Sequence, residues 1–194
     1  DLVPDVGDLP VRFVVVKALE GASTPNKLRA AQAKGAQGAG MLVQYYHFAR
    51  PDLGDPDPVV DAKAEAEAFV KNIRALPAPA DITWGDGNHC AVWLDVEKAV
   101  ERFDTKHCAA WVRTWCEHVE AAGFAAGFYS GKAWFAAEIG PWTASLRPRP
   151  DGSQRPFWAP SYGADNGKVP NRARYNADRR TPPEFQPAAV WQRE

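Results

Sequence analysis

The chain has 194 residues, of which 45 % are hydrophobic and 24 % are charged, and its formal net charge is −1. These values predict one globular domain over residues 1–194 with a substantial core. A charge near zero argues against a partner of the nucleic-acid class, and no apolar run reaches the ~18 residues of a membrane-inserted helix. The N-terminus has no basic segment followed by an apolar one, so no signal peptide is visible.

Apolar runs alternate with helical patterns along the chain. Strands are predicted at residues 11–17, 41–46, 91–96 and 124–129, with two short candidates at 157–160 and 188–192. Helices are predicted at 25–40, from the end of a loop at 49–58 to about residue 74, at 105–122 and at 131–139. This order indicates an α/β protein, built as a TIM-like, regular or irregular (β/α) barrel with mainly parallel strands.

Two acidic residues close the apolar run at 91–94. Asp95 and Glu97 are two positions apart in a predicted strand, so their side chains project from the same face, about 6–7 Å apart at Cβ. Repulsion and desolvation would raise one pKa and make that carboxyl a proton donor near neutral pH. Cleavage of a glycosidic bond is one reaction that needs such an acid. Acidic residues also end strands simply because strand ends meet water, so this pair alone does not decide the function.

Polar and aromatic residues follow the other predicted strands as well. In parallel α/β barrels the catalytic groups lie at the carboxyl ends of the strands. The positions at or just beyond these ends are Lys17, Glu20, Tyr45, Tyr46, His47, Asp95, Glu97, Tyr129 and Trp158. Their agreement over five strands predicts a functional site at this rim.

Two of the rim residues have a structural interpretation beside the functional one. His47 could act as a general base, but a packed histidine that braces the strand end is favoured. Glu20 either reaches the cleft or caps a turn, and the sequence leaves both open. The acidic run at 61–67 is interpreted as the solvent-exposed face of a helix, and the basic stretch at 168–180 as a solvated loop rather than a contact with anionic wall polymers.

The cysteines and the helical tryptophans are assigned to the interior. Cys90, Cys108 and Cys116 lack the spacing of a metal site, so we expect one disulfide or three buried thiols and neither metal nor cofactor. Trp111 and Trp115 recur on one face of the helix at 105–122 and are expected in the core.

Six segments, taken in chain order, resemble the motifs of one enzyme family. They are FVVVKALEG at 13–21, GMLVQYYHFARP at 40–51, VWLDVE at 92–97, GFYS at 127–130, FWAPSY at 157–162 and VWQ at 190–192. Together they resemble glycoside hydrolase family 25, the Chalaropsis-type muramidases, although Leu19 replaces a threonine of the family pattern. The ordered set covers nearly the whole chain, from about residue 11 to 192.

This resemblance implies a lysozyme that hydrolyses the β-1,4 bond between N-acetylmuramic acid and N-acetylglucosamine in peptidoglycan. Glu97 would be the general acid, and Asp95 would stabilise the developing positive charge or orient the acetamido group. The residues expected to bind substrate are Tyr46, Tyr129, Trp158, Glu20 and Asp1. The expected setting is extracellular or at the cell wall, reached by secretion or phage release, with bacterial peptidoglycan as the partner and the protein a monomer. Whether the reaction retains or inverts configuration stays open.

The chain departs from the family pattern near both termini. The family begins with a strand G-[IV]-D-x-S, for which residues 1–3 are the best remnant and Asp5 and Asp8 are poorer candidates. Its last motif, V-D-x-N, is not found after Trp191-Gln192. These departures leave a catalytically degenerate peptidoglycan-binding module on the same fold as the alternative function. A third hypothesis is an unrelated barrel hydrolase that uses the same acid pair on another glycan.

Overall fold

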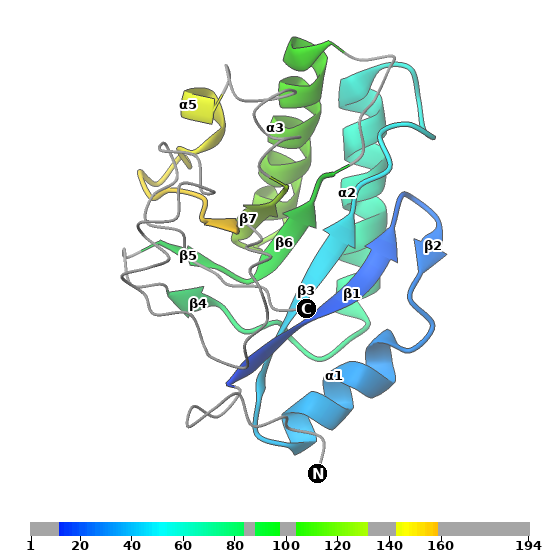
Figure 1. Ribbon diagram of the computed structural model, residues 1–194, viewed down its shortest axis with the longest axis vertical. Coiled ribbons are helices and arrows are strands. Elements are labelled where there is room, and N and C mark those ends of the chain that lie inside the picture. Colours follow the sequence, from blue (N-terminus) through cyan, green and yellow to red (C-terminus); the bar gives the residue numbers. More distant parts are fainter. Residues whose placement is uncertain (1–11, 84–87, 98–103, 132–142, 159–194) are drawn as a thin grey trace, which may run out of the picture.

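The computed structural model describes residues 12–83, 88–97, 104–131 and 143–158 (Figure 1). Its strands are β1 (Phe13–Glu20), β2 (Thr24–Pro25), β3 (Leu42–Phe48), β4 (Ile82–Thr83), β5 (His89–Cys90), β6 (Val92–Asp95), β7 (Ala126–Tyr129) and β8 (Phe157–Trp158). Its helices are α1 (Arg29–Gly38), α2 (Pro58–Arg74), α3 (Thr105–Ala121) and α5 (Thr143–Leu146). Asp1, the predicted helix at 131–139 beyond its first residue, the basic stretch at 168–180 and the strand at 188–192 lie outside the described residues.

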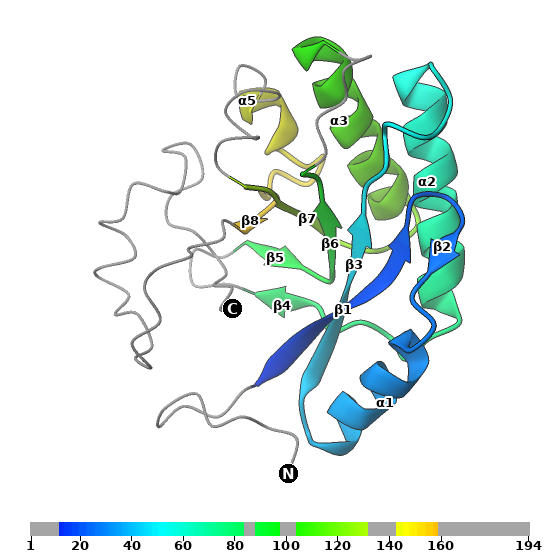
Figure 2. The same cartoon turned by 45° about the vertical axis from the view of Figure 1, so that its right-hand side comes forward.

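The main sheet has the order β2-β1-β3-β6-β7-β8, and all neighbours pair in parallel except β2 with β1. From β1 to β8 each new parallel strand is added on the same side, so right-handed crossovers place the helices on one face. Helices α2 and α3 lie side by side on that face (Figures 1 and 2). This one-way winding is that of a barrel rather than of a doubly wound sheet. It confirms the predicted α/β, TIM-like class.

The long elements begin and end close to their predicted bounds, but three short strands were not predicted. β2, β4 and β5 have two residues each, too few for a periodic pattern to appear in the sequence. Helix α2 begins where Asp57 caps it, accepting hydrogen bonds from the N–H groups of Val59 and Val60, with Pro58 in the first turn. Among the described residues, no helix combines the length and the apolar character needed to cross a membrane.

The two faces of the sheet differ in what covers them. On the helix side, residues such as Val92, Leu94 and Phe128 pack against α2 and α3, where Trp111 and Trp115 are buried as predicted. On the inner side, Cys90 and Trp93 pack with Phe13, Val15, Tyr46 and Trp158. Trp93 is fixed there because its Nε1–H donates to Gln44 Oε1 at 2.8 Å. Asp95, two positions after Trp93, therefore faces the inner side.

Gly127 makes room for the Trp93 ring, because a Cβ at this position would lie 2.8 Å from Trp93 Cζ3. We expect Gly127→Ala to lower the free energy of unfolding by about 1–3 kcal/mol through overpacking. Gly35→Ala is a matched control in α1, where an added Cβ meets nothing within 4 Å. This control should gain about 0.5–1 kcal/mol, since alanine is the better helix former. Urea unfolding measures both, and equal effects would contradict the packing argument.

Of the acidic residues in the run at 61–67, only Glu67 is exposed to solvent, and the sequence interpretation was wrong for Asp61 and Glu65. Asp61 and Glu65 are both 2 % exposed. Asp61 Oδ2 accepts a hydrogen bond of 2.7 Å from Trp111 Nε1, and Glu65 Oε2 lies 2.6 Å from His47 Nε2. Buried carboxylates are tolerated where donors meet them, and here α3 and β3 supply the donors.

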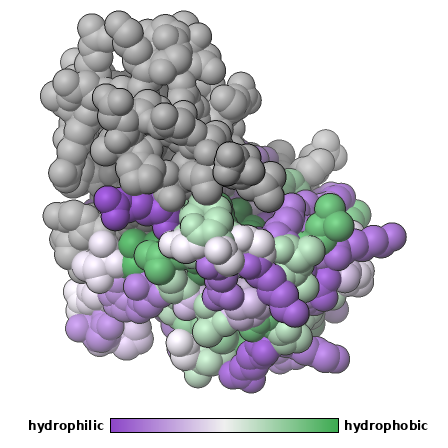
Figure 3. Space-filling view, turned by 90° about the horizontal axis from the view of Figure 1, so that it is seen from below, coloured by the Kyte–Doolittle hydropathy of each residue, from purple (hydrophilic) through white to green (hydrophobic). Residues whose placement is uncertain are grey.

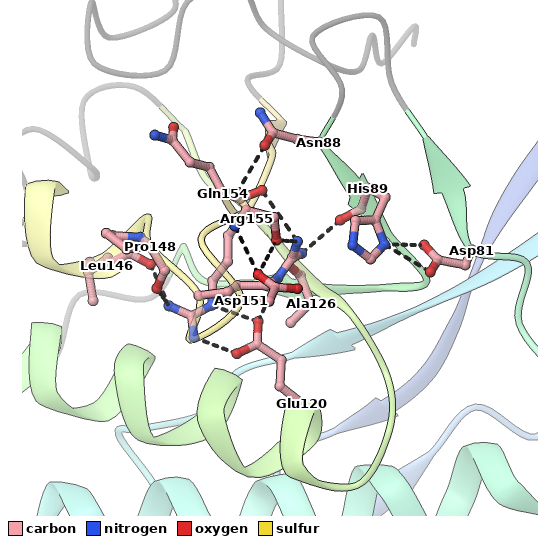
Figure 4. A network of polar contacts seen from close by, with 12 residues as sticks. Asp81, Asn88, His89, Glu120, Ala126, Leu146, Pro148, Asp151, Gln154 and Arg155 are labelled. Carbon is pink, nitrogen blue, oxygen red and sulfur yellow. Dashed lines mark hydrogen bonds and ion pairs between the residues drawn. The ribbon is translucent and has the colours of Figure 1, made fainter.

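A second buried polar network lies between α3 and the strands β5 and β7 (Figure 4). Glu120 of α3 accepts hydrogen bonds from Arg149 and Arg155, which are 7 % and 2 % exposed. Arg149 also donates to the carbonyls of His89 and Ala126, and Arg155 to that of Leu146. The network thereby ties α3, α5, β5, β7 and the segment before β8 together.

The three cysteines are buried thiols, which selects the thiol alternative over a disulfide. The described surface seen from below, at the end where α1 lies, mixes hydrophilic and hydrophobic side chains (Figure 3).

Candidate active site

The carboxyl ends of the parallel strands bring most of the predicted rim residues onto one face, whereas Tyr45 and His47 lie on the other. Lys17 pairs in register with Tyr46, and Tyr46 with Trp93. One pleat further along, Asp95 pairs with Tyr129, and Tyr129 with Trp158. Residues directly opposite one another in a sheet share a face, so this register places cationic, acidic and aromatic side chains together on the inner side.

A bulge in β1 adds Glu20 to this face. The register with β3 shifts between Lys17 and Leu19, so that Leu19 pairs with His47 and Glu20 with Phe48. Without the extra residue, Glu20 would point to the helix side, because side chains alternate along a strand. The shift turns Glu20 towards Lys17, and its Oε2 lies 2.7 Å from Lys17 Nζ. Glu20 therefore lies on the inner face, with its carboxylate between Lys17 and Arg50.

Asp95 is the buried member of the acidic pair. It is 9 % exposed, and its Oδ1 has no hydrogen-bond partner in the described part of the chain. Burial raises the pKa of Asp95 to about 8, and the negative charge of Glu97 adds to the increase. The Lys17 ammonium acts in the opposite direction. Asp95 thus holds a proton at neutral pH when the site is free.

Glu97 is the exposed member of the pair. Partial burial raises its pKa, whereas hydrogen bonds from the Tyr129 hydroxyl and the Gly131 N–H lower it and so limit the increase. These two donors also fix where the carboxyl points. The acidic pair therefore consists of one carboxyl that water and a ligand can reach and one that lies beneath it in the sheet.

Aromatic side chains flank the acidic pair. Trp158 contacts Trp93 and Tyr129 edge to face, with ring centroids 5.4 Å and 5.1 Å apart. Tyr46 is half-buried, and its pKa is raised by burial and by the charges of Asp95, Glu20 and Glu97, so its hydroxyl keeps its proton. The surroundings of the carboxyls offer ring faces and neutral hydroxyls, which suits a polar ligand with apolar faces, such as a sugar.

His47 lies on the other side of the sheet from this site. It is fully buried, stacks on Trp115 with ring centroids 5.5 Å apart, and contacts Glu65. The packed interpretation of His47 agrees with this position. Sequence reasoning missed Arg50, whose guanidinium joins Glu20 and Asp52 at the rim. Arg50 follows β3 in a loop, and no periodic pattern marks such a position.

The model of the family described as "Glycosyl hydrolases family 25" matches residues 4–192, nearly the whole chain. The chain belongs to glycosyl hydrolase family 25. It is a glycoside hydrolase, and the acidic pair lies where a parallel α/β barrel holds its catalytic groups.

Solved structures of a muramidase, a lysozyme and an endolysin share this fold. The muramidase from Trichobolus zukalii is 20 % identical, with a TM-score of 0.65 over 98 % of this chain and 80 % of that one. The lysozyme from Streptomyces coelicolor is 22 % identical, with a TM-score of 0.64 over 98 % of this chain and 75 % of that one. The modular Cpl-1 endolysin is 20 % identical, with a TM-score of 0.57 over 84 % of this chain and 40 % of that one. Among curated proteins, none matches this chain significantly.

The position of Asp95 in this family 25 site should cost stability at alkaline pH. Its pKa is about 8 in the folded chain against an ordinary 3.8, so the unfolded chain loses this proton first as the pH rises. The contribution of Asp95 to the free energy of unfolding is therefore fully present below pH 4 and is lost as the pH rises to 8. Asp95→Asn should therefore melt at nearly the wild-type temperature at pH 4 and be more stable at pH 9, by up to about 5 kcal/mol. Thermal unfolding at several pH values measures the difference in stability between the variant and wild type. A difference that does not grow with pH would contradict the raised pKa of Asp95.

Proposed function

We propose that residues 1–194 form one catalytic domain that hydrolyses the β-1,4 bond between N-acetylmuramic acid and N-acetylglucosamine in bacterial peptidoglycan. The observation that carries this proposal is the acidic pair at the carboxyl end of β6, with both pKa values raised, in a chain of family 25. A raised pKa is what a general acid needs at neutral pH. The Cpl-1 endolysin was solved in complex with a peptidoglycan analogue, which supports the same substrate class here.

Glu97 is the general acid in this mechanism, because it is the member of the pair that a ligand can reach. In the reactive form Asp95 and Glu97 share one proton, and Glu97 carries it. Protonation of the glycosidic oxygen by Glu97 releases the leaving sugar as positive charge develops on the other sugar. The Asp95 carboxylate, left without its proton in that form, stabilises this charge or orients the acetamido group.

The aromatic residues supply the sugar subsites. Tyr46, Tyr129 and Trp158 present rings or hydroxyls on the same face as the acidic pair. Tyr129 has a second role, because its hydroxyl donates to Glu97 and orients that carboxyl. The proposed setting is the bacterial cell wall, where a monomer reaches its substrate after secretion or phage release.

Substrate comparison tests this proposal against its alternatives. We expect the protein to clear suspensions of purified peptidoglycan and to release reducing ends from it, and to leave chitin oligomers largely intact. Preferential cleavage of chitin would instead indicate a hydrolase of another glycan. Binding to peptidoglycan in a sedimentation assay without reducing ends would indicate the degenerate module.

A further inference from the structure

A row of ion pairs lies beside the acidic pair, at the carboxyl ends of β1 and β3. Glu20 bridges two cations, with Oε2 at 2.7 Å from Lys17 Nζ and Oε1 at 2.8 Å from Arg50 Nη1. Arg50 is itself held by two hydrogen bonds to Asp52, of 2.9 Å and 3.0 Å. Both Glu20 and Arg50 are more than two-thirds buried, so this arrangement is screened less than a surface pair.

Contacts of the main chain and Cβ of Arg50 fix the position from which its side chain extends. The Arg50 N–H donates to the buried Glu65 carboxylate, which His47 also contacts. Gly21, with φ +55°, lets the Arg50 side chain pack closely, because a Cβ there would lie 3.3 Å from Arg50 Cβ. The backbone and Cβ of Arg50 are thereby held by α2 and the turn after β1, and its guanidinium contacts Glu20 in turn.

Lys17 stands on the same face as Asp95 but does not bond to it. Its ammonium contacts Glu20 and lies 4.8 Å from the centre of the Phe48 ring, while the Asp95 Oδ1 stays without a partner among the described residues. In register, Lys17 is level with Trp93, one pleat before Asp95. A lysine has a flexible stem, so a direct bond to the unpartnered carboxyl is the arrangement to expect if Glu20 were absent.

We propose that Glu20, anchored by Arg50, is a positioning residue that holds the Lys17 ammonium away from Asp95, so that Asp95 and Glu97 keep their shared proton. A direct Lys17–Asp95 ion pair would favour the ionised carboxylate and remove that proton. The titratable and charged groups facing Asp95 in the described chain are Glu97 from just beyond β6, Lys17 and Glu20 from β1, Tyr46 from β3 and Tyr129 from β7. Lys17 is the only cation among them, so its position decides the balance.

The inference rests on the proposed function for its catalytic meaning, but its first test needs no substrate. Carboxyl-carbon NMR of protein labelled in aspartate and glutamate measures the apparent pKa values of the pair in the free enzyme. We expect Glu20→Gln to lower the higher of the two by about one unit and Lys17→Met to raise it by about half a unit. Lys34→Met, which removes an exposed lysine of α1, should leave both unchanged.

The double variant separates a positioning role from a direct charge effect. If Glu20 acts through Lys17, Lys17→Met combined with Glu20→Gln should titrate like Lys17→Met alone. Additive shifts, or an unchanged or raised pKa in Glu20→Gln, would overturn the proposal. Arg50→Lys should give a smaller shift of the same sign as Glu20→Gln, and it stands in if that variant does not fold.

The pH profile of peptidoglycan hydrolysis provides the second readout. The pH above which kcat/KM falls reports the higher pKa of Asp95 and Glu97 in the free enzyme. It should move down in Glu20→Gln and up in Lys17→Met, and Lys17→Arg should restore the wild-type limit. NMR shifts of the expected sign in a protein that never cleaves peptidoglycan would refute the proposed function and leave the positioning role intact. Activity with unmoved NMR titrations would refute the positioning role alone.

Discussion

Glu97→Gln is expected to lower kcat/KM for peptidoglycan by about 10²–10⁴-fold while the protein stays folded. The amide keeps the shape of the carboxyl and can still accept hydrogen bonds from Tyr129 and Gly131, but it has no acidic proton to donate. Because Glu97 is exposed and its pKa is raised by partial burial, losing its charge does not destabilise the fold. Initial rates of reducing-end release, with circular dichroism as the check on folding, measure the effect.

Glu67→Gln is the matched control for this variant, since Glu67 is an exposed glutamate of α2 that lies 3.9 Å from His118. It should retain wild-type activity and stability within about 0.5 kcal/mol. Full activity in Glu97→Gln would remove Glu97 from the role of general acid.

Glu120→Gln is expected to lower the free energy of unfolding by about 3–5 kcal/mol. Glu120 is the carboxylate shared by Arg149 and Arg155, and both guanidiniums are at most 7 % exposed. Without it, two buried cations are left with backbone carbonyls as their main partners (Figure 4). A typical domain has only about 5–15 kcal/mol of net stability, so this loss is large.

Urea unfolding measures this loss. The acidic pair and the Glu120 network involve different residues, so the activity per folded molecule should stay near that of wild type. A decrease below about 1 kcal/mol would show that the network contributes little to stability.

The sequence was sufficient for the features that depend on local periodicity. The two-residue alternation of a strand placed Asp95 on the inner face, and the helical period placed Trp111 and Trp115 in the core. Glu97 lies two residues beyond the end of β6, and hydrogen bonds from Tyr129 and Gly131 set its direction instead of strand alternation. The order of strands and helices was likewise enough for the α/β class, because parallel neighbours need a crossover between them.

The features that depend on one irregular residue or on tertiary packing could not be predicted from periodic sequence patterns. A bulge in β1 turns Glu20 to the rim, and nothing in FVVVKALE marks the extra residue. Asp61 and Glu65 looked solvent-exposed because an Ala/Glu pattern carries no sign of the indole and imidazole that meet them across α3 and β3. Arg50 falls within the motif at 40–51, but no periodic pattern marks its role, which emerges only when the ends of β1 and β3 lie side by side.

The most direct test of the account is mass spectrometry of the fragments released from purified peptidoglycan by the wild-type protein and by Glu97→Gln. The account predicts wild-type fragments that end in reducing N-acetylmuramic acid, and their loss in the variant. Fragments that end in reducing N-acetylglucosamine, or equal release by both proteins, would contradict the proposed bond or the proposed acid.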